Sequence, residues 1–115
     1  MTRYETYAKE ESVPVIFADY NGIITAVNRK FEEDFLWSAE ELVGKSLNEI
    51  IPVELHDSHN MGFSRYVLSG QSSMLGTPLD LKITRGDGEV VLAEHYIVDM
   101  KGDGKELVAA RIIPR

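Results

Sequence analysis

The sequence contains no cysteine among its 115 residues. Disulfides, zinc–thiolate centres, iron–sulfur clusters, c-type haem attachment and photochemistry through a flavin–cysteinyl bond are therefore excluded. Positive charge is also scarce, because 12 basic residues stand against 19 acidic residues and give a net charge of −7. No cluster of lysines and arginines offers a track for phosphates. We therefore expect neither nucleic acid nor a membrane surface as a partner.

Long apolar runs are absent as well. No stretch approaches the roughly 18 apolar residues of a membrane span, and the start Met1-Thr2-Arg3-Tyr4 is not typical of a signal peptide. The expected location is therefore cytoplasmic. The apolar fraction of 43% and the length of 115 residues suit one ordinary folded domain. We expect that domain at residues 13–115, preceded by a short amphipathic helix or cap at residues 1–12.

The residue patterns of enzymes are also missing. The serines have neither a nucleophile elbow nor a neighbouring base. The glycine turns separate strands rather than a strand and a helix, so they do not predict phosphate loops. The acidic residues lack the spacing of a metal-binding loop. We therefore do not expect this chain to be an enzyme.

A hairpin is the clearest local signal near the start of the chain. Two apolar runs, Val13–Ala18 and Ile23–Val27, are separated by Asp19-Tyr20-Asn21-Gly22. Asn-Gly between two such runs is typical of a tight turn between antiparallel strands. The sequence therefore predicts two paired strands here.

Helix-start signals follow the hairpin. Asn28 can cap a helix that carries Phe31 and Phe35 on one face. Ser38-Ala39-Glu40-Glu41 has the pattern of a capping box, and Ser46-Leu47-Asn48-Glu49 repeats it. We expect short helices after each of these caps.

A longer helix and three strands complete the pattern. Apolar and aromatic residues recur at helical spacing over residues 55–69, and Gly70 is a typical stop. Strand-like segments follow at Leu79–Thr84, Val90–Asp99 and Leu107–Ile113. Two strands, several helices and three strands predict an α+β fold with an antiparallel sheet and helices packed on one face.

Three segments carry a resemblance to a known family. They are Asp19–Asn28, Trp37–Leu47 and Arg85–Glu89. In this order and spacing they resemble the PAS family of sensory domains over about residues 13–114. The resemblance implies a five-stranded sheet that, closed by helices, holds a small ligand or cofactor. It also implies a regulatory domain of a bacterial signalling protein, with a covalently attached output domain such as a histidine kinase or diguanylate cyclase.

Residues 52–98 are most similar to the haem-binding PAS domain of the oxygen-sensing histidine kinases that control nitrogen fixation. The stretch His59–Tyr66 matches the helix that carries the proximal haem histidine there. The resemblance implies that His59 is the metal ligand if haem is bound, and that Arg65 meets a haem propionate. The sequence departs from that pattern at Leu79, which replaces the distal arginine, and at His95, which replaces an apolar residue.

Alternation along residues 90–99 predicts which side chains face the cavity. Glu94 marks one face as the solvent side, so Ala93, His95 and Ile97 face inward. The resemblance also places Ala110 inward, and two small alanines on one wall leave space. The expected cofactor-binding residues are His59, His95, Arg65, Phe63, Tyr66, Leu79, Ala93, Ile97 and Ala110. Haem, another small ligand and a filled core without ligand remain alternatives.

The opposite face of the same strand is unusually apolar for a solvated sheet. Val90, Leu92, Tyr96 and Val98 lie on it. Such a patch usually meets a partner, so a homodimer is expected. The helix around Tyr4–Ala8 is an alternative cover. A ligand-free interaction or dimerisation module is the alternative function.

Two further residues have expected structural places. His56 is expected at the surface, and Trp37 is expected to anchor the core rather than to stack on a flavin. The chain stops at Pro114-Arg115, directly after its last predicted strand. We therefore expect an output domain to follow.

Overall fold

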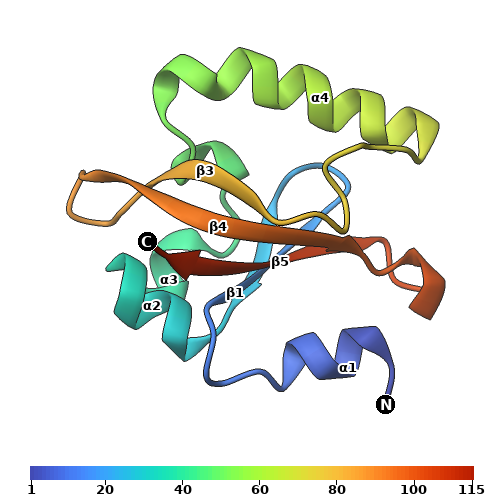
Figure 1. Ribbon diagram of the computed structural model, residues 1–115, viewed down its shortest axis with the longest axis horizontal. Coiled ribbons are helices and arrows are strands. Elements are labelled where there is room, and N and C mark those ends of the chain that lie inside the picture. The colour runs from blue at the N-terminus through green and yellow to red at the C-terminus, as the bar shows by residue number, and fades with distance from the viewer.

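A five-stranded antiparallel sheet forms the centre of the computed structural model, which describes residues 1–115 (Figure 1). Its spatial order is β2-β1-β5-β4-β3. The strands are β1 (Val15–Asp19), β2 (Ile24–Val27), β3 (Leu79–Thr84), β4 (Val90–Asp99) and β5 (Leu107–Pro114). The α+β fold class and the five strands expected from the sequence are confirmed.

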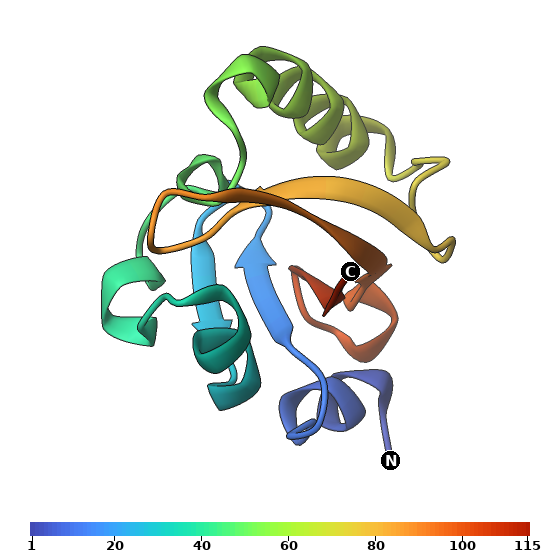
Figure 2. The same cartoon turned by 60° about the vertical axis from the view of Figure 1, so that its left-hand side comes forward.

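Helices lie on both sides of this sheet. The α-helices are α1 (Arg3–Ala8), α2 (Arg29–Phe35), α3 (Ala39–Leu42) and α4 (His56–Ser69), with 3₁₀ turns at Leu47–Glu49, Val53–Leu55 and Lys101–Asp103. Figures 1 and 2 show α4 and α1 on opposite sides of the sheet. The face that carries α2, α3 and α4 is called the inner face below, and the face covered by α1 is called the outer face.

Strand alternation divides the buried side chains between these two faces. The larger core cluster joins Phe31 and Phe35 of α2 to inner-face residues such as Ile16 and Ile112. A second cluster joins Tyr7 of α1 to outer-face residues, Val15, Phe17, Val98 and Ala109 among them. Because successive side chains of a strand point to opposite faces, Val15 and Ile16 enter different clusters.

The first hairpin forms as the sequence predicts. The Asp19 carboxylate accepts the backbone N–H groups of Asn21 at 2.8 Å and Ile23 at 3.0 Å. Gly22 has a φ of +76°, which glycine adopts without steric cost. The pairing of β1 with β2 shifts register between Phe17 and Ala18.

The helix caps agree with the sequence at two of three places. Asn28 accepts the N–H of Phe31 at 2.9 Å, and Ser38 forms a reciprocal capping box with Glu41. The predicted capping box at Ser46 is wrong. Ser46 instead accepts the Asn48 N–H and caps only a 3₁₀ turn. The Leu47 N–H donates to the Gly22 carbonyl at 2.8 Å and joins this segment to the hairpin.

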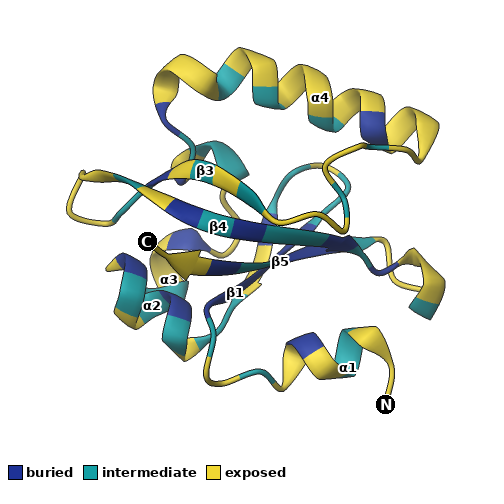
Figure 3. Cartoon of the chain, in the orientation of Figure 1, coloured by how far each residue is buried: buried dark blue, intermediate teal, exposed yellow.

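Helix α4 stands apart from the rest of the fold. Tyr66 is its only buried residue, and Figure 3 shows the helix mostly exposed or half-buried. Gly70 ends it in the left-handed conformation, as the sequence predicts. At 14 residues α4 is the longest helix, and no helix combines the length and apolar character that a bilayer crossing needs.

Candidate functional site

A cavity of about 470 Å³ lies between α4 and the inner face of the sheet. Sites for small molecules typically measure roughly 300–1,000 Å³. Of the 22 residues that line this cavity, 16 are apolar. The polar residues on its wall are Ser58, His59, Ser72, Lys82 and His95, and Tyr66 adds a hydroxyl. An apolar pocket with a few polar groups has the composition of a ligand site.

The space results from small side chains on both walls. Ser58 and Gly62 of α4 face the cavity, and Ala18 and Ala110 lie on the wall formed by the sheet. Protein interiors are normally packed without large voids, so a wall of small residues leaves room that large residues would fill. Two large apolar residues of α4, Met61 and Leu68, do not fill it, since they are 63% and 89% exposed.

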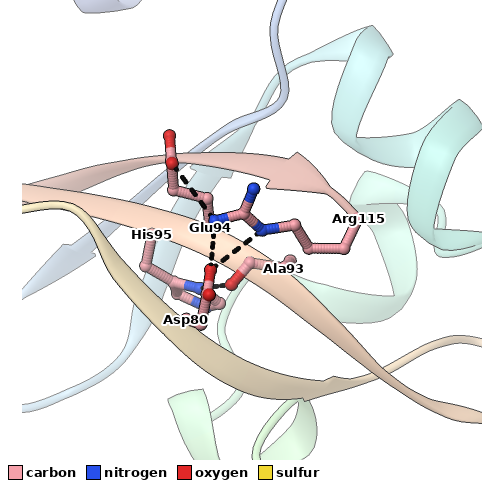
Figure 4. Close-up of polar contacts among 5 residues, drawn as sticks. All are labelled: Asp80, Ala93, Glu94, His95 and Arg115. Carbon is pink, nitrogen blue, oxygen red and sulfur yellow. Dashed lines mark hydrogen bonds and ion pairs between the residues drawn. The ribbon is translucent and has the colours of Figure 1, made fainter.

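His95 lies on the sheet side of the cavity. Only 9% of the residue is exposed. Its Nδ1 atom is 3.0 Å from the carbonyl oxygen of Ala93, two residues earlier on β4 (Figure 4). Burial lowers the pKa of the imidazole, with smaller opposing effects from the Ala93 hydrogen bond and the Asp80 charge. His95 is therefore neutral at pH 7.

His59 approaches the cavity from α4, the opposite wall. Its ring lies 5.8 Å from the ring of Phe63, and its Nδ1 atom is enclosed without a hydrogen-bond partner. Burial lowers the pKa of this imidazole too; Asn60 opposes the shift and His56 adds to it. The cavity thus has one neutral imidazole on each of two facing walls.

Several other residues expected at the site also lie on the cavity wall. They are Phe63 and Tyr66 of α4, Ile97 of β4 and Ala110 of β5. Tyr66 is 7% exposed and its hydroxyl has no hydrogen-bond partner. Helix spacing predicted the places of Phe63 and Tyr66, strand alternation that of Ile97, and the resemblance that of Ala110.

Arg65, Leu79 and Ala93 are not among the residues that line the cavity, and their role in binding stays a prediction. Arg65 is exposed, because six residues of helix turn it about 240° away from His59. Ala93 points inward but is packed completely within the larger core cluster. Leu79 pairs with His95 across the strands, yet the residues of β3 that line the cavity are Leu81 and Lys82.

Part of the wall comes from segments that strand and helix patterns do not mark. Leu47, Ile50 and Ile51 line the cavity from the connection before α4, and Ser72 and Leu75 line it from the connection after α4. The sequence predicts a short helix near Leu47 and a connection around Ser72 and Leu75, but no spacing pattern marks these residues as parts of a cavity wall.

His56 is not a free surface residue as expected. Its Nε2 atom lies 2.9 Å from the Asn48 carbonyl oxygen and 2.7 Å from the Ile51 carbonyl oxygen. Because both partners only accept hydrogen bonds, Nε2 carries the hydrogen. This bond ties the start of α4 to the preceding connection and so helps to hold one wall of the cavity. Trp37 does anchor the core, and its Nε1 donates to the Thr84 carbonyl at 2.9 Å.

Comparison with known proteins agrees with this architecture. The chain is 31% identical over 97 residues to an uncharacterised protein of Azorhizobium caulinodans, a match that covers 84% of this chain. The chain spans only 13% and 7% of the length of two curated relatives that it matches.

Two solved structures share the fold at low sequence identity. The PAS domain of an HTR-like protein from Haloarcula marismortui superposes with a TM-score of 0.73 at 19% identity, covering 98% of this chain and 89% of that one. The PAS domain of the quorum-sensing receptor RpfR from Cronobacter turicensis, in complex with C12:0, has a TM-score of 0.64 at 15% identity, covering 92% and 96%. The family model described as PAS fold matches residues 2–108. With its sheet, its helices and its cavity, this chain belongs to the PAS family.

Proposed function

We propose that this domain is the sensory input module of a bacterial signalling protein, and that the cavity under α4 binds its signal molecule. The cavity itself carries the proposal: about 470 Å³ of mostly apolar space within an otherwise packed fold. A void of this size has the volume of about sixteen waters at liquid density, and apolar walls hydrate poorly. Filling it with an apolar ligand is therefore favourable.

The lining points to a molecule with an apolar body and one polar group. Few polar side chains face the space, and two of them are neutral imidazoles on opposite walls. The RpfR domain, which shares the fold, was solved in complex with C12:0, an acyl chain with a single polar end. A ligand of comparable build suits this chain.

Haem is a second candidate, supported by His59. Its imidazole is neutral at pH 7 and lies on an apolar wall, as an axial haem ligand does. Arg65, however, is exposed and does not line the cavity, so the propionate contact implied by the resemblance has no support in this geometry. Lys82 is the cation on the wall instead. Bound haem would supply gas binding or electron transfer.

A binding experiment with two probes tests the proposal. Isothermal titration of the purified domain with 1-decanol and, separately, haem reconstitution followed by a search for a Soret band would identify the class of ligand. Ala110→Leu places a larger side chain in the cavity and should abolish decanol binding. Ala26→Leu, at an exposed position of β2, is the matched control and should bind normally. Binding of neither probe would contradict the proposed function.

Output requires partners, and we propose a covalently attached output domain of the kinase or cyclase kind, with a homodimer formed through the outer face. Helix α1 covers part of that face, since Tyr7 packs on Val98. Val90, Leu92 and Ile113 remain 46%, 51% and 43% exposed. This uncovered region also supports the alternative of an interaction module without ligand, which the binding experiment distinguishes.

A further inference from the structure

The tautomer of His95 is fixed by its position on β4. Its Nδ1 atom is 3.0 Å from the Ala93 carbonyl oxygen, and a carbonyl oxygen only accepts hydrogen bonds. Nδ1 must therefore carry a hydrogen and donate it. In a neutral imidazole only one ring nitrogen carries hydrogen, so the other nitrogen, Nε2, presents a lone pair.

That lone pair has no partner within the protein. No hydrogen bond joins Nε2 to another residue, and Nε2 is not among the polar side-chain atoms that the fold encloses without a partner. Since His95 is 9% exposed and lies on the cavity wall, the cavity is the space that remains open to Nε2. A molecule in the cavity is thus the natural partner of this acceptor.

The charged groups near His95 do not supply a competing donor or carboxylate. Asp80 and Glu94 occupy the outward-facing positions beside it, and both bond to Arg115 (Figure 4). The Arg115 Nε and Nη2 atoms donate to Asp80 at 2.9 and 2.6 Å. Nη2 also donates to Glu94 at 3.4 Å. On the inner side, His59 belongs to the opposite wall. Lys82 of the neighbouring strand β3 lies on the same strand face as Asp80, and no hydrogen bond joins it to His95. No carboxylate therefore stabilises a charged form of His95 from within the cavity.

We infer that His95 selects the ligand by accepting a hydrogen bond at Nε2, so that the cavity takes molecules whose polar group is an O–H or N–H donor. This inference rests on the proposed function. Alcohols, amides and un-ionised acids fulfil the requirement. Ethers do not, because they leave the buried acceptor unsatisfied, and carboxylate anions do not, because their oxygens face a lone pair.

The preference should be measurable as a difference in affinity. 1-Decanol and methyl nonyl ether are isomers of the same size, but only the alcohol has an O–H group to donate. A buried polar group left without its partner weakens binding by about 10-fold or more. Sites built around a hydrogen bond discriminate against analogues that lack it for this reason.

The first test needs no ligand. Long-range ¹H–¹⁵N spectra of the ligand-free domain at neutral pH should show His95 with hydrogen on Nδ1 and a bare Nε2, identified by comparison with His95→Gln. Observation of hydrogen on Nε2 would overturn the inference, whatever the cavity binds.

The second test uses the matched probes. Isothermal titration at pH 8 should give decanol at least about 10-fold tighter than methyl nonyl ether or decanoate. His95→Gln, which retains a carbonyl acceptor, should keep much of that preference, whereas His95→Phe should remove it while ether binding persists. Equal binding of decanol and ether by the unmodified domain would contradict the role of His95 and leave the proposed function intact. Failure of every probe would contradict the proposed function, and with it the selection by His95.

Discussion

Gly86 lies directly against the backbone of Leu36, and a Cβ atom built on Gly86 would be 1.7 Å from the Leu36 carbonyl oxygen. The Gly86 N–H also donates to the Phe35 carbonyl at 2.9 Å. Leu36 caps α2 in the left-handed conformation, with φ of 59°. The turn between β3 and β4 is thereby joined to the end of α2, which packs in the core under β1. Any side chain at Gly86 must separate these two segments.

We expect Gly86→Ala to destabilise the fold by about 2–4 kcal/mol, because the added carbon overlaps backbone atoms that have no room to move. Gly102→Ala is the matched control. A Cβ at Gly102 meets nothing within 4 Å, and its φ lies outside the positive range, so the change should stay within about 0.5 kcal/mol. Urea denaturation of both variants checks this. Equal midpoints would show that the turn moves away from α2 without cost.

Asn28 joins three segments through one side chain. Its Oδ1 accepts the N–H groups of Phe31 at 2.9 Å and Val15 at 3.0 Å. Its Nδ2 donates to the carbonyls of Glu10 at 3.0 Å and Val13 at 2.8 Å. The residue is therefore more than a helix cap, because it also fixes the chain between α1 and β1.

Replacing Asn28 should thus cost more than replacing an ordinary cap. We expect Asn28→Ala to lower the free energy of unfolding by about 2–4 kcal/mol, since four hydrogen bonds are lost. Ser38→Ala, which removes a single cap at α3, should cost about 1 kcal/mol. Asn28→Asp keeps the acceptor but turns a carboxylate oxygen toward two carbonyls, so it should not restore stability. Denaturant unfolding of the three variants measures these free energies. Equal losses of unfolding free energy in Asn28→Ala and Ser38→Ala would contradict the role of Asn28 in joining the three segments.

Tyr20 donates its hydroxyl to both carboxylate oxygens of Asp99, at 2.8 and 3.0 Å. Burial, this hydrogen bond and the Asp99 charge raise the pKa of Tyr20 from 10.0 to about 12. Because the folded pKa is higher than the unfolded one, the stabilisation is present below about pH 10 and is lost as the pH rises toward 12. In an alkaline absorbance titration one of the five tyrosines should ionise late, and Tyr20→Phe should remove that late phase. A late phase that persists in the variant would contradict the assignment.

Acid should destabilise the domain through the two cavity histidines. The pKa values of His59 and His95 are lowered in the folded state by burial. Below the ordinary histidine pKa of 6.5, the unfolded chain binds more protons than the folded one, so stability falls as the pH falls. At neutral and higher pH the effect vanishes. In the double variant His59→Phe/His95→Phe, stability should fall less steeply between about pH 7 and 5 than in the unmodified domain. The midpoint of urea unfolding at each pH measures this. The same slope in both proteins would show that other groups cause the decline.

Self-association should depend on the uncovered part of the outer face. Tyr96 is a poor probe of it, because its ring lies 5.7 Å from the Arg111 guanidinium and packs with the α1 cluster. Leu92 is 51% exposed, and we expect Leu92→Glu to shift the proposed dimer toward monomer in sedimentation analysis. Val53→Glu, at a position 79% exposed before α4, should leave the dimer unchanged. A monomeric unmodified domain at high micromolar concentration would contradict the proposed dimer.

Local sequence signals predicted most of the fold, because each depends on residues a few positions apart. Asn21-Gly22 turned the first hairpin, Asn28 and Ser38 capped their helices, and Gly70 ended α4. The alternation of β4 placed His95 inward for the same reason, since side chains two residues apart share a face. The capping pattern at Ser46 failed in a segment that a non-local hydrogen bond, from the Leu47 N–H to the Gly22 carbonyl, joins to the hairpin.

The candidate site was predictable only in part. His59, Phe63 and Tyr66 share one stripe of α4, so helical spacing placed them together. Arg65 came from the resemblance alone, and the rotation of the helix puts it outside. Ala93 faces inward as alternation requires, but whether an inward residue meets space or a packed core depends on what lies opposite, and here Phe31 and Phe35 belong to the same cluster.

The sequence by itself determined the strands, the helix ends and the face on which each side chain lies, because these follow from backbone geometry and near neighbours. Only the tertiary structure decided that a cavity exists and which residues reach it. Its volume depends on how far α4 stands from the sheet, and that distance is set by packing between elements. His56 bonds to the carbonyls of Asn48 and Ile51 in the preceding connection, and Tyr66 packs against Ala18 and Val108 of distant strands. The tertiary structure also fixed the tautomer of His95, since the distance between Nδ1 and the Ala93 carbonyl depends on the rotamer that the packed fold selects.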